Sequence, residues 1–135
     1  MEFVASGRAY PHFQVISNEL GTARILLCPN DGERVCATNF FDLKDRNLSY
    51  FLNVDAREGD SASLLSGDRN ITNRAPERDR LVSLTGANTI AWTEHIHSEK
   101  GNLCFGDGSV GSFRNGSVGT SVKIQTGMTN RLAVP

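Results

Sequence analysis

The glycines of residues 106–111, Gly-Asp-Gly-Ser-Val-Gly, are spaced as in the phosphate-binding loop of a dinucleotide-binding domain. Such a loop opens directly into a helix, and an acidic residue follows about 20 positions later. Here Gly116 and Gly119 follow, each weakening a helix by about 1 kcal/mol relative to alanine, and no acidic residue comes after Asp107. Asp107-Gly108 instead predicts a tight β-hairpin in which glycine supplies a positive φ angle.

Two serines approach the Gly-x-Ser-x-Gly spacing of a hydrolase nucleophile elbow. The first position of the motif is Asp107 for Ser109 and Asn115 for Ser117, so neither segment fits. We expect both serines to be surface hydroxyls.

His95 and His97 are two residues apart, which on a strand places both imidazoles on one face, a spacing that zinc and copper sites use. Cys104 or Glu99 could add a ligand, but the sequence offers no second ligand pair. A small hydrolase or metal enzyme built on the two histidines with Glu94 or Asp107 is therefore a minor hypothesis. We assign no catalytic residue, metal ligand or cofactor.

Four aspartates could gather around a calcium ion, because calcium takes hard oxygen ligands from scattered positions. They are Asp55, Asp60, Asp68 and Asp107. The linear calcium-loop pattern is missing, and most of these carboxylates are expected in turns and caps. A composite calcium site stays open as an alternative.

The three cysteines, Cys28, Cys36 and Cys104, do not form the even set of a disulfide scaffold or a Cys-x-x-Cys motif. Cys28 and Cys36 could bridge a short loop in an oxidising compartment. Cys104 lies in an apolar strand pattern and is expected as a small buried side chain.

Composition is that of one globular domain over residues 1–135, with 39% hydrophobic and 21% charged residues. The formal net charge is -1. Arginines at 69, 74, 78 and 80 alternate with acidic residues, so nucleic acid is not an expected partner. No run of about 18 apolar residues and no secretory signal pattern is present in the sequence.

The N-terminal third predicts one helix and two strands. Phe13, Ile16 and Leu20 have helical spacing and Gly21 follows, so residues 12–20 predict a short helix. Residues 24–28 predict a strand that ends at Pro29, before an Asn-Asp-Gly turn at 30–32. Residues 47–54 alternate in the two-residue period of a strand with one buried face, and we expect this strand to be central.

The rest of the chain predicts short strands separated by turns. Leu64 begins an extended segment after the polar loop 55–63. Further strands are predicted at 81–84, 89–93 and 103–105 and around Val110 and Phe113, with turns at 76–80, 85–88 and 97–101. The predicted fold class is α+β, a short N-terminal helix packed on an antiparallel β-meander.

Five segments together resemble the soluble head of bacterial type II secretion pseudopilin-like proteins, members of the type IV pilin class, of the kind found in Verrucomicrobia and relatives. The segments are ISNELGTARILLCPND (16–31), NLSYFLNVDA (47–56), LLSGDRNIT (64–72), HSEKGNLCFGDGSV (97–110) and TNRLAVP (129–135). Their order and spacing carry the resemblance, which covers most of residues 13–135.

The resemblance implies a pilin-like head and a structural role without catalysis. In this class the head follows an apolar N-terminal helix that anchors the subunit in the inner membrane and packs in the filament core. That helix is not in this sequence, and we expect a trimmed soluble part rather than a diverged member. Location on the periplasmic side of the inner membrane, other pilin or pseudopilin subunits as partners, and secreted cargo as a further partner follow from the resemblance.

The resemblance also implies architectural roles for Gly101, Asn102, Asp107, Gly108, Ser109 and Val110, as the turn and hairpin of the head's sheet. The leading hypothesis is therefore a non-enzymatic structural subunit of a pseudopilus or pilus-like assembly. The alternative is a stand-alone periplasmic module that binds protein or glycan through the loops 55–63 and 73–80, because loops on a rigid scaffold often carry binding.

Overall fold

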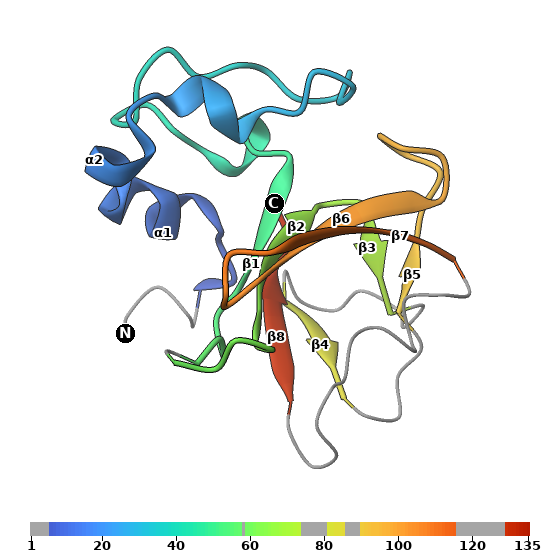
Figure 1. Cartoon of the computed structure of the whole chain (residues 1–135). Coiled ribbons are helices and arrows are strands. Elements are labelled where there is room, and N and C mark those ends of the chain that lie inside the picture. The colour runs from blue at the N-terminus through green and yellow to red at the C-terminus, as the bar shows by residue number, and fades with distance from the viewer. Residues whose placement is uncertain (1–5, 58, 74–80, 86–89, 116–128) are drawn as a thin grey trace.

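The computed structural model describes residues 6–57, 59–73, 81–85, 90–115 and 129–135, which form antiparallel strands and short helices (Figure 1). The helices are α1 (Tyr10–Val15), α2 (Ser17–Leu20) and the 3-10 helices η2 (Ala23–Leu26) and η3 (Asp45–Asn47). The strands are β1 (Tyr50–Asn53), β2 (Leu64–Asp68), β3 (Ile71–Thr72), β4 (Leu81–Leu84), β5 (Ala91–Trp92), β6 (Lys100–Phe105), β7 (Val110–Arg114) and β8 (Asn130–Ala133). The α+β class predicted from the sequence is confirmed.

Six strands form one antiparallel sheet in the order β4-β8-β1-β2-β6-β7, and β3 pairs with β5 in a separate ribbon. The prediction of a simple meander is wrong, because β8 lies between β4 and β1 instead of following β7. Leu132 and Ala133 of β8 are fully buried, and a strand buried on both faces is most stable inside a sheet. Ala133 pairs with Leu52 of β1 and with Leu81 of β4.

Strand β1 is central, as predicted, between β8 and β2. The two-residue alternation is confirmed, but the fully buried face is that of Phe51 and Asn53, while the face of Tyr50 and Leu52 is only half-buried. Phe51 is fully buried in one apolar cluster, while Tyr50 and Leu52 pack against a second cluster on the opposite face.

One apolar cluster lies on each face of the sheet. The first lies between the sheet and the β3–β5 ribbon, and the second lies between the sheet and the helical layer (Figure 1). On the ribbon side the buried residues are Phe51, Leu64, Ile71, Val82, Leu84, Ile90, Trp92, Leu103 and Leu132. On the helical side they are Ala9, Phe13, Ala23, Leu26, Ala37, Leu43, Leu48 and Ala133. Segments from all parts of the described chain thus pack against the two faces of one sheet.

Two local predictions in the N-terminal part need correction. The helix predicted over 12–20 is two short helices, because the backbone leaves helical geometry at Ile16 (φ -99°, ψ 22°); Gly21 ends the second at φ 72°. The strand predicted over 24–28 is the 3-10 helix η2, whose first turn is capped by the Thr22 hydroxyl accepting from the Arg24 amide. The predicted turn at 76–80, most of that at 85–88 and Ser117 lie outside the described residues.

The β-hairpin predicted at Asp107-Gly108 joins β6 to β7. Gly108 has φ 81°, its amide donates to the Phe105 carbonyl at 2.9 Å, and the Asp107 carboxylate accepts from the Ser109 amide at 2.9 Å. Val110 then pairs with Cys104. Gly101 and Asn102 lie within β6, so their expected place in a turn is wrong and the turn before β6 ends at Glu99.

Substituting Gly108 with alanine tests this turn. A β-carbon at Gly108 meets no atom within 4 Å, so only the backbone conformation resists the change, and we expect a loss of about 1–2 kcal/mol of unfolding free energy in urea titrations. Gly108→Asn should lose less, because asparagine tolerates positive φ. Gly32→Ala, which is equally uncrowded and has no positive φ, is the control, and an equal effect of both alanine variants would contradict the prediction.

Candidate functional site

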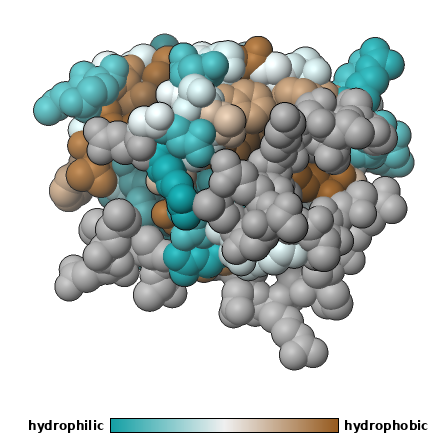
Figure 2. All heavy atoms as spheres, turned by 60° about the horizontal axis from the view of Figure 1, so that its bottom comes forward, coloured by the Kyte–Doolittle hydropathy of each residue, from teal (hydrophilic) through white to brown (hydrophobic). Residues whose placement is uncertain are grey.

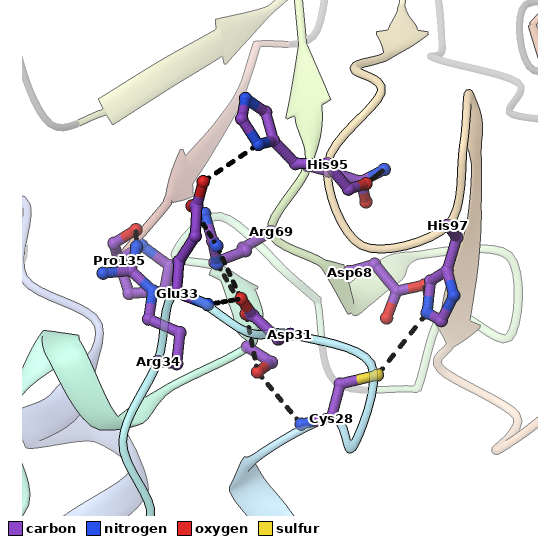
Figure 3. A network of polar contacts seen from close by, with 11 residues as sticks. Cys28, Asp31, Glu33, Arg34, Asp68, Arg69, His95, His97 and Pro135 are labelled. Carbon is purple, nitrogen blue, oxygen red and sulfur yellow. Dashed lines mark hydrogen bonds and ion pairs between the residues drawn. The ribbon is translucent and has the colours of Figure 1, made fainter.

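Polar side chains from segments far apart in sequence converge beside the sheet, between the loops 28–34 and 93–99 (Figure 3). We call this set the inter-loop cluster. It consists of Cys28, Asp31, Glu33, Ser49, Asp68, Arg69, Asn70, His95, His97 and Asn102. The loops are placed by β1 and β2, since Ser49 directly precedes β1's first residue and Asp68 ends β2.

Asp31 is the centre of the cluster and is paired with Arg69 in a two-bond fork. Arg69 Nε donates to Asp31 Oδ2 and Arg69 Nη2 to Asp31 Oδ1, both at 2.7 Å. The Ser49 hydroxyl also donates to Asp31 Oδ2, at 2.8 Å. Burial would raise the pKa of Asp31, but the hydrogen bonds from Arg69 and Ser49, with the arginine charge, outweigh it and hold the pKa below its ordinary value.

The network continues from Arg69 to the surface. Arg69 Nη2 also donates to Glu33 Oε2 at 2.7 Å, and Glu33 Oε1 lies 3.0 Å from His95 Nδ1. The hydrogen bond from Arg69, followed by the charge of His95, lowers the pKa of Glu33. The hydrogen bond to Asp31 is the main cause that raises the pKa of Arg69. Arg69, directly after β2, thus joins Asp31 and Glu33 of loop 28–34, and Glu33 in turn contacts His95 of loop 93–99.

Arg34 extends the same network to the segment after β8. Its Nη2 donates to the Pro135 carbonyl at 2.5 Å. Burial, and then the charge of Arg69, lowers the pKa of Arg34. The two guanidinium groups thus share the negative charge of Asp31 and Glu33.

A second group, Cys28, His97 and Asp68, lies at the other end of the cluster (Figure 3). His97 Nε2 is 3.6 Å from Cys28 Sγ and 3.5 Å from Asp68 Oδ2. The Asp68 oxygen also accepts from the Asn102 amide at 2.7 Å and from Asn102 Nδ2 at 3.0 Å. Burial raises the pKa of Asp68 against these hydrogen bonds.

This trio differs in geometry from a Cys-His-Asp catalytic triad. In a triad the nucleophile and the orienting carboxylate use opposite nitrogens of the imidazole. Here Cys28 and Asp68 both approach Nε2 of His97. Asp68 therefore does not hold the ring in the orientation that a general base toward Cys28 needs.

Loop 93–99 has an unusual backbone. Ile96, Ser98 and Glu99 have positive φ angles of 65°, 51° and 60°, and for a β-branched residue such as Ile96 this conformation is rare. Side chains from other segments hold the loop: Asn70 Nδ2 donates to the carbonyls of Thr93 (3.2 Å), His95 (2.9 Å) and Lys100 (2.9 Å), and Asn30 Nδ2 donates to the Ile96 carbonyl.

The expectation that His95 and His97 share one face of a strand is wrong. The positive φ of Ile96 reverses the backbone between them, so His95 points to Glu33 and His97 to Cys28 (Figure 3). Among the residues that the structure describes, no three or more His, Cys, Asp or Glu side chains are placed to hold a metal ion.

The four aspartates considered for calcium are engaged at separate places. Asp55 pairs with Arg131 at 2.6 Å, and the hydrogen bond from this arginine lowers the pKa of Asp55. Asp60 accepts from the Ala62 amide at 3.0 Å. Asp107 accepts within its hairpin, while Asp68 belongs to the inter-loop cluster. Two of the four, Asp60 and Asp107, thus accept hydrogen bonds within turns, as predicted for most of them.

The three cysteines are free thiols, so the optional bridge between Cys28 and Cys36 is not formed. Cys28 is buried and Cys36 is exposed. Cys104 is only half-buried in β6, where it pairs with Val110 beside the turn of the β6–β7 hairpin.

The residues assigned architectural roles fall into two groups at opposite ends of β6. Gly101 and Asn102 lie beside the inter-loop cluster, where Asn102 binds Asp68 and a β-carbon at Gly101 would stand 2.3 Å from the Trp92 ring. Asp107–Val110 form the hairpin at the far end, about 20 Å away along the strand. The set His95, His97 and Asp107 considered for an enzyme is therefore not brought together.

Sequence reasoning missed Asp31, Ser49, Arg69 and Asn70 as members of a site. Arg69 was interpreted only as part of a scattered basic set, and Asp31 only as a turn residue. The one usable signal is the run Asp68-Arg69-Asn70, because three consecutive residues with charged or amide side chains stand at the end of a strand that begins with two leucines.

No protein-family model, curated protein or solved structure matches this sequence. Among the described residues, no helix combines the length and the hydrophobicity that a membrane-spanning segment needs.

Proposed function

We propose that this chain is the head of a type II secretion pseudopilus or type IV pilus-like subunit, a non-enzymatic structural protein on the periplasmic side of the inner membrane. One observation carries the proposal. The five segments that resemble pseudopilin heads converge, since each of 16–31, 47–56, 64–72 and 97–110 supplies residues to the inter-loop cluster, and Arg34 binds the carbonyl of Pro135 in 129–135.

The chemistry of the cluster supports a structural role. The Ser49 hydroxyl donates to Asp31 and accepts from the Cys28 amide at 2.9 Å. Asn70 Nδ2 donates to three backbone carbonyls, and the Asn102 amide donates to Asp68. Polar groups arranged in this way hold loops in place. These contacts support a structural role for the segments that resemble pseudopilin heads.

Fractionation of the bacterium that encodes the chain tests the proposal. With an antibody against residues 1–135, we expect a species larger than 14.7 kDa in the inner-membrane fraction, and a ladder of multiples after treatment with an amine-reactive cross-linker. A fraction of the antigen should also appear in sheared filaments. A single soluble species without multiples would overturn the structural role.

A stand-alone binding module remains the second candidate, favoured by the exposed apolar side chains of the helical layer. Phe41 is 89% exposed, Val15 70% and Val35 64%, and exposed aromatic residues are common anchors in interfaces. For a binding module, the cross-linked product should contain a different protein at a fixed ratio instead of multiples of the chain. Figure 2 shows that apolar and polar residues are interspersed on another face of the molecule.

A further inference from the structure

Strand β8 lies between β4 and β1 and pairs with both of them (Figure 1). Among the described strands, β8 is the one neighbour of β4 in the sheet. Leu132 and Ala133 are fully buried, Leu132 in the cluster on the ribbon side and Ala133 in the cluster on the helical side. Residues 52–55 and 81–84 thus hold an extended strand by its backbone along two edges and by its side chains on both faces. We call these two segments the acceptor site.

Polar contacts fix one register of β8 in the acceptor site. The Arg131 amide and guanidinium donate to the Asp55 carboxylate at 2.8 Å and 2.6 Å. The Arg131 carbonyl accepts from the Val54 amide at 2.9 Å. Asn130 Oδ1 accepts from Asn53 Nδ2, also at 2.9 Å. The acceptor site therefore selects the sequence Asn-Arg-Leu-Ala through a charge pair, an amide pair and two buried apolar side chains.

The length of chain before β8 does not restrict the strand to its own molecule. Residues 115–129 separate the end of β7 from the start of β8. Fifteen residues can span at most about 50 Å, whereas a domain of 135 residues has a radius of gyration of about 14 Å. The connection is therefore long enough for β8 to reach the acceptor site of a neighbouring copy and to make the same contacts there.

We propose that the acceptor site binds β8 of a second copy of this chain in exchange for its own β8. A second copy carries the Asn-Arg-Leu-Ala sequence that the site selects, in the strand that the site holds. Added strands gain affinity from backbone hydrogen bonds and specificity from side chains, and both are present here on two edges. The exchange does not depend on the proposed function.

The energetics set the conditions under which exchange is expected. An exchanged pair keeps the contacts of β8, so domain swapping is a low-cost route to a dimer. The strand of the same chain competes at an effective concentration on the order of 1 mM. Exchange is therefore expected when chains fold together at about this concentration, and reciprocal exchange closes a two-fold dimer in which neither acceptor site is empty.

A disulfide that can form only between copies tests the exchange. Ser83 of β4 and Arg131 of β8 are directly opposite each other. Both backbone polar groups of Arg131 bond on the β1 side, so this pair is non-hydrogen-bonded, with Cα atoms about 4.5 Å apart, as a disulfide requires. Ser83→Cys and Arg131→Cys are made in separate chains that carry Cys36→Ser and Cys104→Ser, and one chain has a tag that changes its size. The two chains are unfolded in urea, refolded together and oxidised.

The expected product is an 83–131 disulfide between a tagged and an untagged chain, identified by peptide mapping. While the dimer is the minor species, a tenfold higher refolding concentration should raise its fraction about tenfold by mass action. Ser83→Cys and Arg131→Cys combined in one chain and refolded at high dilution should form the same bond within the molecule. That bond without any bond between copies at about 1 mM would overturn the proposal.

The β6–β7 hairpin provides the matched control. Cys104 and Val110 are also directly opposite and non-hydrogen-bonded, since the next pair is bonded from the Phe105 amide to the Ser109 carbonyl. Only four residues join these two strands, too few to exchange β7 between molecules. A Val110→Cys chain without Cys104, mixed with a chain that keeps Cys104, should therefore give no 104–110 bond between copies. Equal yields of the 104–110 and 83–131 bonds would show that both arise from random collisions and would contradict the exchange.

If the combined variant forms no disulfide, the unsubstituted protein decides the question. After refolding at about 1 mM, size-exclusion chromatography with light scattering measures its mass. A monomer throughout would overturn the exchange. A dimer is prepared from equal amounts of ¹³C-labelled and unlabelled chains, and isotope-filtered NMR should detect contacts between Leu132 of one copy and Val82 of the other, which are opposite each other in the sheet. A dimer without these contacts would assign the association to another surface and refute the proposal.

Discussion

Replacing Asp31 with alanine is expected to lower the free energy of unfolding by about 3–5 kcal/mol, measured by urea titration at pH 7. The side chain of Asp31 is 1% exposed and that of Arg69 10% exposed. The substitution leaves the Arg69 guanidinium buried with Glu33 as its remaining partner, beside the guanidinium of Arg34. An uncompensated buried charge is more destabilising than the loss of the same bonds at a surface.

Two variants separate this cause from a general loss of packing. Glu33→Gln removes the exposed acidic partner of Arg69 and should change stability by less than about 1 kcal/mol. Asp31→Leu combined with Arg69→Met replaces both buried charges by apolar side chains and should recover much of the loss, since the isolated charge is gone. The explanation fails if Asp31→Ala is as mild as Glu33→Gln, or if the double variant is as unstable as Asp31→Ala.

Gly101→Ala is expected to lower the unfolding free energy by about 2–3 kcal/mol, because the added methyl group enters occupied space. The new β-carbon would stand 2.3 Å from the ring of Trp92, which is 2% exposed. The ring has little freedom to move, because it is packed in the core. The Trp92 backbone is also fixed, since its amide donates to Asn115 Oδ1 at 2.7 Å and its carbonyl accepts from Asn115 Nδ2 at 3.0 Å.

The same urea titration on Gly32→Ala provides the comparison. No atom lies within 4 Å of a β-carbon at Gly32, so that variant should be neutral or slightly more stable, because alanine restricts the unfolded chain. Near-ultraviolet circular dichroism of Gly101→Ala should also show a changed Trp92 signal. A stable Gly101→Ala variant with an unchanged signal would mean that the strand accommodates the methyl group without contact with the ring.

Sequence patterns predicted the elements that are specified by residues close together in the chain. The alternation around Phe51 identified the central strand β1, and Asp107-Gly108 identified the β6–β7 hairpin, because turn chemistry is encoded within a few residues. The strand predicted over 24–28 is wrong because its apolar residues are equally compatible with a 3-10 helix. The Thr22 hydroxyl accepts from the Arg24 amide and starts that helix. The insertion of β8 beside β1 has no local signal at all.

The inter-loop cluster could not be predicted for a related reason. Asp31 and Arg69 are 38 residues apart, and Cys28 and His97 are 69 residues apart. Known sequence motifs join residues that are much closer in the chain, so no motif indicates that either pair is in contact. The sequence did contain both histidines as candidates, but their orientation depends on the backbone reversal at Ile96, and isoleucine gives no indication of a positive φ angle.

The position of β8 constrains the order in which the molecule can be built. Strands β1 and β4 are both held by β8, so neither obtains that neighbour until residues 130–133 are available. During synthesis, β1 and β2 can meet early, but β4 must wait until residues 130–133 have left the ribosome. Pairings between such distant residues also slow folding, so we expect β4 to join the sheet as one of its last strands.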